Sequence, residues 1–276
     1  MKKLYNSALL TAMLALTNTV STTVSAHSRV VIPSHFTISK TGGDWVTFDI
    51  TGTESTFVFD KTGGNAAPEI VLPNGQIASP DMVIRGQRRS VFDFRFRQQG
   101  THKVVNKADP KFITFYNVST HKKPKRIRVN KTERDRLLPE GATNIRSIMS
   151  HTRSETYVTV GRPTDSVFKI DGNLLEMKPI THPSDIIEGE PVTMQFYYNG
   201  KVKPRIEAVI IRDGTPYRNN QEEIVLTSDK DGKITFTPPV ADRYLMKASY
   251  KSEAKKHPLA DTIYSNVHLT FEAALR

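Results

Sequence analysis

The sequence predicts an all-β protein with two antiparallel β-sandwich domains, the second of immunoglobulin or prealbumin type, after a cleaved signal peptide. Short runs rich in β-branched and aromatic residues recur along the chain, and turn-forming Gly, Pro and Asn residues separate them. No long segment has the 3.6-residue periodicity of an amphipathic helix. Many short strands at this spacing are typical of a sandwich or a barrel.

The N-terminal segment has the three parts of a secretory signal. Lys2 and Lys3 are positively charged, residues 8–16 form a short apolar core, and residues 24–26 are small enough for a signal peptidase to read. The apolar core is too short to span a membrane stably. We therefore expect residues 1–26 to be removed by cleavage after Ala26 and the protein to be periplasmic.

The first expected domain covers residues 27–180. Residues 90–97 are its clearest strand, because apolar and polar side chains alternate there and one face must be buried. Residues 154–161 form another clear strand near the end of the domain. Further strands are expected at residues 45–50, 57–60, 69–72, 102–106, 111–116 and 174–180.

The second expected domain covers residues 183–276 and follows a junction at residues 181–185. The junction reads Thr-His-Pro-Ser-Asp, which favours a turn or loop. Its strands are expected at residues 192–198, 206–211, 223–228, 233–237, 243–250 and 267–272. This number of short strands predicts a small antiparallel sandwich.

The charge of the chain is strongly basic. The formal net charge is +11, and the signal carries Lys2 and Lys3 without any acid, which leaves +9 for the rest. The densest basic run, residues 121–131, is expected either as a solvated loop or strand face or as a contact for an anionic surface; residues 132–138 are expected to form one short helix. After export, nucleic acid is not an expected partner, whereas an anionic envelope surface or an acidic protein is.

The residue types exclude several chemistries. The chain has no cysteine, so it has no disulfide, no thiolate metal site and no cysteine nucleophile. It also lacks a glycine-rich phosphate loop, a Gly-x-Ser-x-Gly elbow and a His-Glu-x-x-His helix. We therefore expect a binding protein and no enzyme.

Four residues are candidate metal ligands. Cleavage after Ala26 makes His27 the first residue, whose α-amine, with an ordinary pKa of about 8, can chelate a metal together with the ring. Asp49 and Asp60 end strands near that segment, and His182 lies at the expected junction, where ligands often bind. The alternatives are a chance position for His27, turn caps for the carboxylates and a buried hydrogen bond for His182.

The order of motifs resembles a periplasmic family known as domain-of-unknown-function family 4198. The likeness spans nearly the whole chain after the signal. It is carried by His27, Pro33-Ser34, Trp45-Val46-Thr47, Phe59-Asp60, residues 154–164, residues 181–190, residues 227–232 and Arg243-Tyr244-Leu245.

The resemblance implies export, β-sandwich-like parts and a link to nickel, cobalt or iron uptake. It also implies that His27 is a plausible ligand for Ni, Co, Cu or Fe. Lys61 stands where a histidine is expected after the Phe-Asp pair, which removes one expected ligand.

The resulting hypothesis is a non-enzymatic periplasmic accessory protein for transition-metal or metal-chelate uptake, whose partners are membrane uptake or reductase components. Two alternatives stay open: an envelope carbohydrate- or protein-binding module, and a copper enzyme that uses a mature N-terminal histidine.

Overall fold

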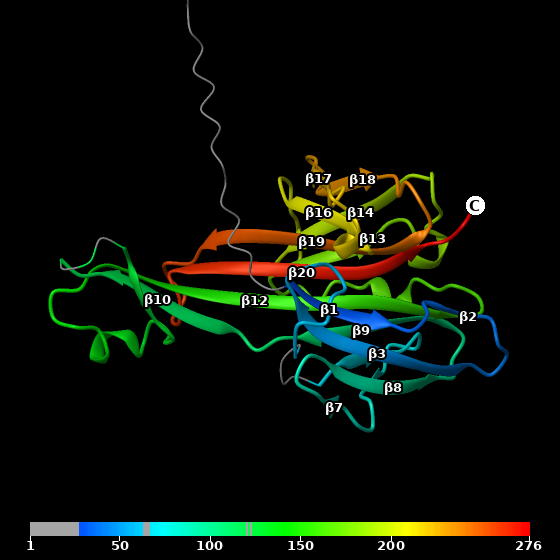
Figure 1. Ribbon diagram of the computed structural model, residues 1–276, viewed down its shortest axis with the longest axis horizontal. Helices are drawn as coiled ribbons and strands as arrows, with labels where there is room; N and C mark the ends of the chain where they lie inside the picture. The colour runs from blue at the N-terminus through cyan, green and yellow to red at the C-terminus, as the bar shows by residue number, and fades with distance from the viewer. Residues whose placement is uncertain (1–27, 63–66, 120, 122) are drawn as a thin grey trace, which may run out of the picture.

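The computed structural model describes residues 28–62, 67–119, 121 and 123–276 (Figure 1). These residues form twenty β-strands and four short 3-10 turns, and none of them forms an α-helix. Within this part of the chain, no helix is long and apolar enough to cross a membrane. The predicted all-β fold is confirmed. The expected signal peptide and His27 lie outside the described residues.

The first sandwich packs a five-stranded sheet against part of a larger sheet. The small sheet consists of β1 (Ser28–Pro33), β3 (Asp44–Thr53), β4 (Lys61–Thr62), β7 (Ile84–Arg85) and β8 (Ser90–Phe96). The opposing strands are β2 (Thr37–Ile38), β5 (Glu69–Val71), β6 (Ile77–Ala78), β9 (Gly100–Lys107) and the end of β12 (Thr143–Val160). Between the layers, the Phe48 and Phe92 rings stack 4.7 Å apart in the apolar core. The alternation predicted for residues 90–97 therefore buries one face of β8, as expected.

The second sandwich uses the other half of the same large sheet. Its four-stranded sheet consists of β13 (Leu175–Pro179), β14 (Val192–Tyr198), β15 (Lys201–Val202) and β18 (Lys233–Phe236). The opposing strands are β16 (Glu207–Arg212), β17 (Ile224–Thr227), β19 (Asp242–Glu253) and β20 (Thr262–Ala273). Three of the four 3-10 turns lie in the connections, as η2 (Ser166–Phe168), η3 (Pro183–Asp185) and η4 (Thr215–Tyr217). The β-sandwich predicted for this half is confirmed.

The expected domain boundary near residues 180–183 is misplaced. β13 was expected to belong to the first domain, residues 27–180, but it pairs antiparallel with β14 from Leu175–Tyr198 to Pro179–Met194. Val167 and Phe168, which precede it, also pack in the core of the second sandwich. The chain therefore passes into the second sandwich soon after β12 ends at Val160.

β12 joins the two sandwiches into one continuous sheet. It pairs antiparallel with β9 near its end and parallel with β20 through nine residue pairs, from Ile148–Thr262 to Thr156–Thr270. Because side chains alternate between the faces of a strand, Val158 points into the first core and Tyr157 into the second. One strand therefore contributes to both cores.

A buried ion cluster fixes β13 and β9 against β12. Arg153 is only 3% exposed, and its guanidinium lies 2.6 Å from Glu155, 3.2 Å from Glu176 and 3.3 Å from Asp171. Lys103 of β9 lies 3.2 Å from the same Glu155 oxygen. Burial alone would raise the pKa of Glu155, but Arg153 and Lys103 outweigh it and hold that pKa below its usual range.

Glu176 also orders the turn that leads into β13. Its carboxylate accepts backbone N–H groups of Asp171, Gly172 and Asn173 at 2.8, 2.8 and 3.0 Å. Gly172 has a φ of 79°, a conformation that favours glycine. One carboxylate thus satisfies three donors and a buried arginine.

The beginning of β1 is held by β12 and β20. The hydroxyl of Ser154 donates to the Arg29 carbonyl at 2.9 Å, and Nδ1 of His268 lies 2.8 Å from the same oxygen. Burial lowers the pKa of His268 to about 4, with Lys247 and Arg29 adding repulsion. In the first sandwich, burial also lowers the pKa of His102 to about 4. Both rings are therefore neutral at pH 7.

We predict that the free energy of unfolding falls as the pH drops from about 6.5 to about 4. The folded pKa values of His102 and His268 lie below the ordinary 6.5, so the unfolded chain binds more protons in this window. The stabilisation is complete above pH 6.5 and is lost toward pH 4. Urea unfolding at pH 7, 6, 5 and 4.5 measures it, and His268→Asn should flatten the dependence. A slope that the variant leaves unchanged would contradict the assignment to His268.

We predict that Arg153→Met lowers the free energy of unfolding by about 3–5 kcal/mol, because it leaves buried carboxylates without a counter-charge. Lys107→Met is the matched control, since it breaks the half-exposed ion pair with Glu69 and should cost far less. Urea unfolding of both variants at pH 7 provides the comparison. Equal losses in the two variants would show that the buried cluster does not stabilise the fold.

Candidate binding surface

The predicted carboxylate ligands lie in surroundings that disfavour a metal cation. Asp49 lies 3.1 Å from the Arg89 guanidinium. Burial raises the pKa of Asp49, while Arg89 and Arg243 oppose that rise. Asp60 lies 4.0 Å from the Lys61 ammonium. A cation bound to either carboxylate would have to displace these positive charges.

His182 has hydrogen-bond partners at both ring nitrogens. Nδ1 lies 2.7 Å from the Ser184 hydroxyl and Nε2 lies 2.9 Å from the Thr101 hydroxyl. Nδ1 also accepts the Ser184 backbone N–H and so caps η3. His182 therefore connects residues 182–184 to β9 through hydrogen bonds. Such a hydrogen-bonding role was the alternative to metal binding that the sequence left open for His182.

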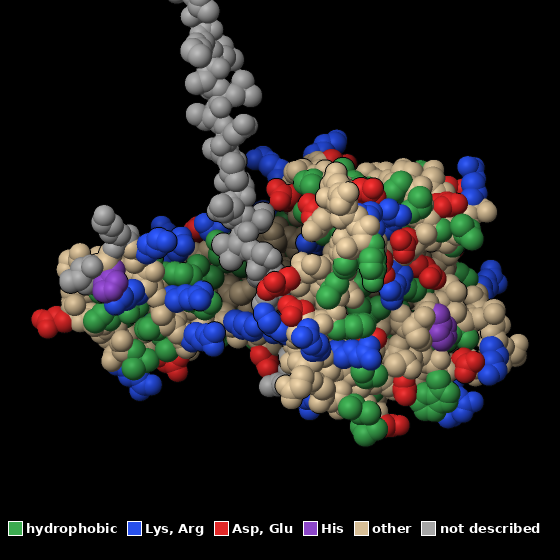
Figure 2. Space-filling model, in the orientation of Figure 1, with side chains coloured by type: hydrophobic (Ala, Val, Ile, Leu, Met, Phe, Trp, Pro, Cys, Tyr) green, Lys and Arg blue, Asp and Glu red, His purple; other side chains and the backbone are tan. Residues whose placement is uncertain are grey.

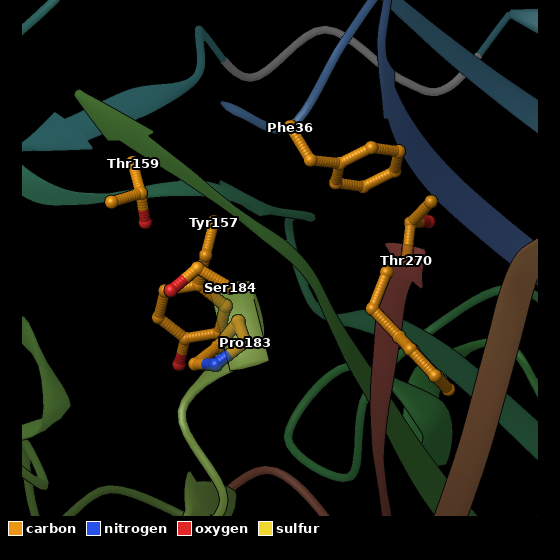
Figure 3. A pocket seen from close by; sticks show the side chains of 7 residues that line it. Phe36, Tyr157, Thr159, Pro183, Ser184 and Thr270 are labelled. Carbon is orange, nitrogen blue, oxygen red and sulfur yellow. The ribbon is translucent and has the colours of Figure 1, made fainter. Parts of the chain in front are cut away.

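The junction beside His182 is nearly filled. Figure 3 shows Tyr157, Thr159, Pro183, Ser184 and Thr270 converging with Phe36 around a cavity of about 10 Å³, also lined by Phe271. That volume is about the space of one water molecule. Ligand pockets occupy about 300–1,000 Å³, so this cavity does not accommodate a small-molecule ligand.

The described residues do not form a metal site from the predicted ligands. In the described part of the chain, no three His, Asp or Glu side chains form a group that could hold a metal ion. Asp49, Asp60 and His182 are therefore not brought together, and His27 lies outside the described residues. The prediction of a metal site at these positions finds no support in their geometry.

An arm extends from the two sandwiches and carries most of the net positive charge. The arm, residues 111–150, comprises β10 (Lys111–Asn117), β11 (Lys125–Ile127), η1 (Arg134–Arg136) and the first part of β12 (Figure 1). Its sequence contains ten Lys or Arg and three Asp or Glu residues, a net charge of +7. Figure 2 shows Lys and Arg side chains along it, with hydrophobic side chains between them. The helix expected at residues 132–138 is only the short η1.

Strand register gives the arm two different faces. β10 lies between β11 and β12, with Phe115 opposite both Arg126 and Arg146, and Lys111 opposite Ser150. Residues opposite one another share a face. One face, which we call the basic face, is defined by Lys111, Ile113, Phe115, Arg126, Arg146 and Ile148. We include Arg128 in it, because this exposed residue directly follows β11 and repels Lys111.

The other face of the arm is covered. Thr114, Tyr116, Ser147 and Met149 on that face are buried. The Thr114 hydroxyl donates to the Val129 carbonyl, and Arg134 donates to the Ser147 hydroxyl. The segment after β11 therefore packs over this face, and the cations of the basic face stay exposed.

The cations of the basic face are not neutralised within the protein. Among the described residues, no carboxylate forms an ion pair with Lys111, Arg126, Arg128 or Arg146. Burial lowers the pKa of Lys111, and repulsion from Arg29 and Arg128 lowers it further. A bound anion would reduce the repulsion among these neighbouring positive charges.

The carboxylate of Asp261, which lies beside the arm, is already neutralised by two cations. Asp261 is 2.8 Å from Lys131 and 2.6 Å from Arg134. Burial favours the neutral form of Asp261, but these hydrogen bonds and the Ser147 amide lower its pKa to about 2. It therefore neutralises the covered side of the arm and leaves the basic face positive.

An open groove of about 700 Å³ runs beside the arm. It is lined by Phe115, Asn117, Pro124, Asn144, Ile145, Arg146, Glu253, Lys255 and Asp261. The lining contains both signs of charge, and two of its residues, Phe115 and Arg146, also belong to the basic face. The groove therefore offers less electrostatic selectivity for an anion than the face does.

Part of this surface was visible in the sequence. The run at residues 121–131 predicted either a solvated face or an anionic contact, and it contributes Arg126 and Arg128. Lys111, Phe115 and Arg146 were not identified, because their register with β11 was unknown. The alternation within residues 111–116 was the available signal, since it separates the two faces of β10.

Comparisons with known proteins show distant structural likenesses. The D0-D1 domain of intimin is 11% identical with a TM-score of 0.20, and the match covers 87% of this chain and 96% of that chain. The fibronectin(III)-like modules of Clostridium thermocellum CbhA are 12% identical with a TM-score of 0.23, covering 89% and 95%. No match was found among curated proteins. These likenesses carry no argument about function.

A protein-family model matches most of the chain. The model describes a domain of unknown function, DUF4198, and it matches residues 24–252. This span includes the first sandwich, the arm and most of the second sandwich. The resemblance inferred from the order of the motifs is thereby confirmed, and the chain belongs to the DUF4198 family.

Proposed function

We propose that this protein is an exported, non-enzymatic accessory protein that binds an anionic partner through the basic face of its arm. The observation that carries the proposal is the register that places Lys111, Arg126 and Arg146 on one uncovered face, with Arg128 near Lys111. Among the described residues, none of these four cations forms an ion pair with a carboxylate. Such a surface attracts anions and increases the rate of their encounter.

The link to metal uptake remains part of the proposal and rests on the family resemblance. An anionic metal chelate suits the basic face better than a bare metal cation, which the same charges would repel. The periplasmic location likewise rests on the signal predicted for residues 1–26. Membrane uptake or reductase components are the corresponding protein partners.

We predict that the protein binds heparin, a polyanion, and that Arg126→Glu with Arg146→Glu weakens this binding at least about tenfold. Lys201→Glu with Lys230→Glu is the matched control, because it makes the same charge change at exposed positions of the second sandwich. Elution from a heparin column against a salt gradient measures the effect. Equal losses in both double variants would show that overall charge, and no particular face, determines binding.

We predict that residues 27–276 bind ferric citrate, an anionic chelate, in the micromolar range, and that the Arg126→Glu, Arg146→Glu variant loses this binding. Calorimetric titration with ferric citrate and, separately, with nickel chloride distinguishes chelate from cation. His27→Ala, titrated with nickel chloride, tests the direct-metal form. Absence of binding to both compounds would remove metal cargo from the proposed function.

A further inference from the structure

We infer that the anionic partner of the basic face is the surface of a phospholipid membrane. This inference rests on the proposed function and names the partner class of the same face. Its first basis is the shape of the face, which spans three adjacent strands. β10 alone has seven residues, about 20 Å of extended chain.

The cations are distributed along this face and do not converge on one point. Lys111 begins β10, whereas Arg126 and Arg146 lie four residues further along, on either side of Phe115. Arg128 follows β11 and lies close enough to Lys111 to repel it. Several separated phosphates, as at a lipid surface, match this arrangement better than a single small anion does.

The side chains between the cations are apolar. Ile113, Phe115 and Ile148 are partly exposed, and Phe115 lies between two arginines in register. Aromatic and aliphatic side chains among cations are typical of surfaces that lie in the interfacial region of a membrane. They would contact the boundary of the acyl chains while the guanidinium and ammonium groups reach phosphates.

The base of the arm adds a further cation. Arg29 of β1 lies near Lys111, and burial lowers its pKa, opposed by Asp109. Hydrogen bonds to Ser154 and His268 hold the backbone of Arg29 in place. Arg29 therefore adds a partly exposed cation, with Asp109 near it, where the arm joins the sandwiches, so that docking would orient the whole molecule.

A single-stranded nucleic acid would also suit cations interleaved with an aromatic ring. The predicted export signal favours the membrane, because an exported protein meets lipid phosphates and is separated from cytoplasmic nucleic acid. Nucleic acid is therefore an outcome of the test that would overturn the inference.

Vesicle co-sedimentation tests this inference with the processed chain, residues 27–276. The vesicles contain 30 mol% phosphatidylglycerol in phosphatidylcholine, and vesicles of pure phosphatidylcholine serve as the reference. We expect binding to the anionic vesicles only, and less binding at 500 mM than at 100 mM NaCl. Arg126→Glu with Arg146→Glu should weaken it about 25-fold or more, from about a fivefold loss for each cation removed.

Controls separate this inference from the proposed function. Lys201→Glu with Lys230→Glu should retain vesicle binding, and thermal unfolding confirms that both double variants are folded. Heparin binding that depends on the face, without preference for anionic vesicles, would overturn the membrane inference and leave the proposed function standing. If the unsubstituted protein binds neither heparin nor anionic vesicles, both the membrane inference and the proposed function are overturned. Tighter binding to a single-stranded oligonucleotide than to the anionic vesicles would also overturn the membrane inference.

Discussion

The parallel pairing of β12 with β20 is the constraint on which the other features depend. Nine residue pairs join strands that lie 114 residues apart in the sequence. Without this pairing the two sandwiches would be separate domains connected by a linker. With it, the large sheet runs through both, and its two halves cannot rotate independently without breaking main-chain hydrogen bonds.

Sharing a strand between two cores also explains the buried charges. β12 is covered on both faces, by the first sandwich on one side and by β13 with its preceding turn on the other. Arg153 and Glu155 lie where β12 passes between the two cores, and their charges are matched to Glu176, Asp171 and Lys103. Buried ion pairs contribute little net stability compared with apolar packing, but a buried charge without its partner is strongly destabilising. This cluster therefore disfavours alternative registers of β13.

The sequence predicted the local structure well and the long-range pairing poorly. Alternation identified β8, and turn residues identified most strand ends, because both signals arise within a few residues. The assignment of β13 to the first domain failed because an apolar strand does not specify its partner sheet. The parallel pairing of β12 with β20 could not be predicted, because no pattern within either segment indicates its partner strand.

The same limit applies to the candidate sites. His182 was expected at a domain junction, but the boundary does not lie there. Its ring partner Thr101 lies 81 residues away in the sequence, so the hydrogen bond between them could not be predicted. The basic run at residues 121–131 was evident, whereas the basic face required the register of three strands. A surface assembled from alternate residues of separate segments becomes visible only once that register is known.

The eighteen-residue length of β12 has a mechanical consequence. The strand that carries the arm is the same strand that passes between the two cores, so no hinge separates the arm from the body. Tension applied to the arm along β12 acts parallel to the strand. It therefore stresses the main-chain hydrogen bonds between β12 and β20 together, in shear, instead of breaking them one at a time. The arm is thus a continuation of the central strand of the molecule, and a force on it is transmitted directly to both sandwiches.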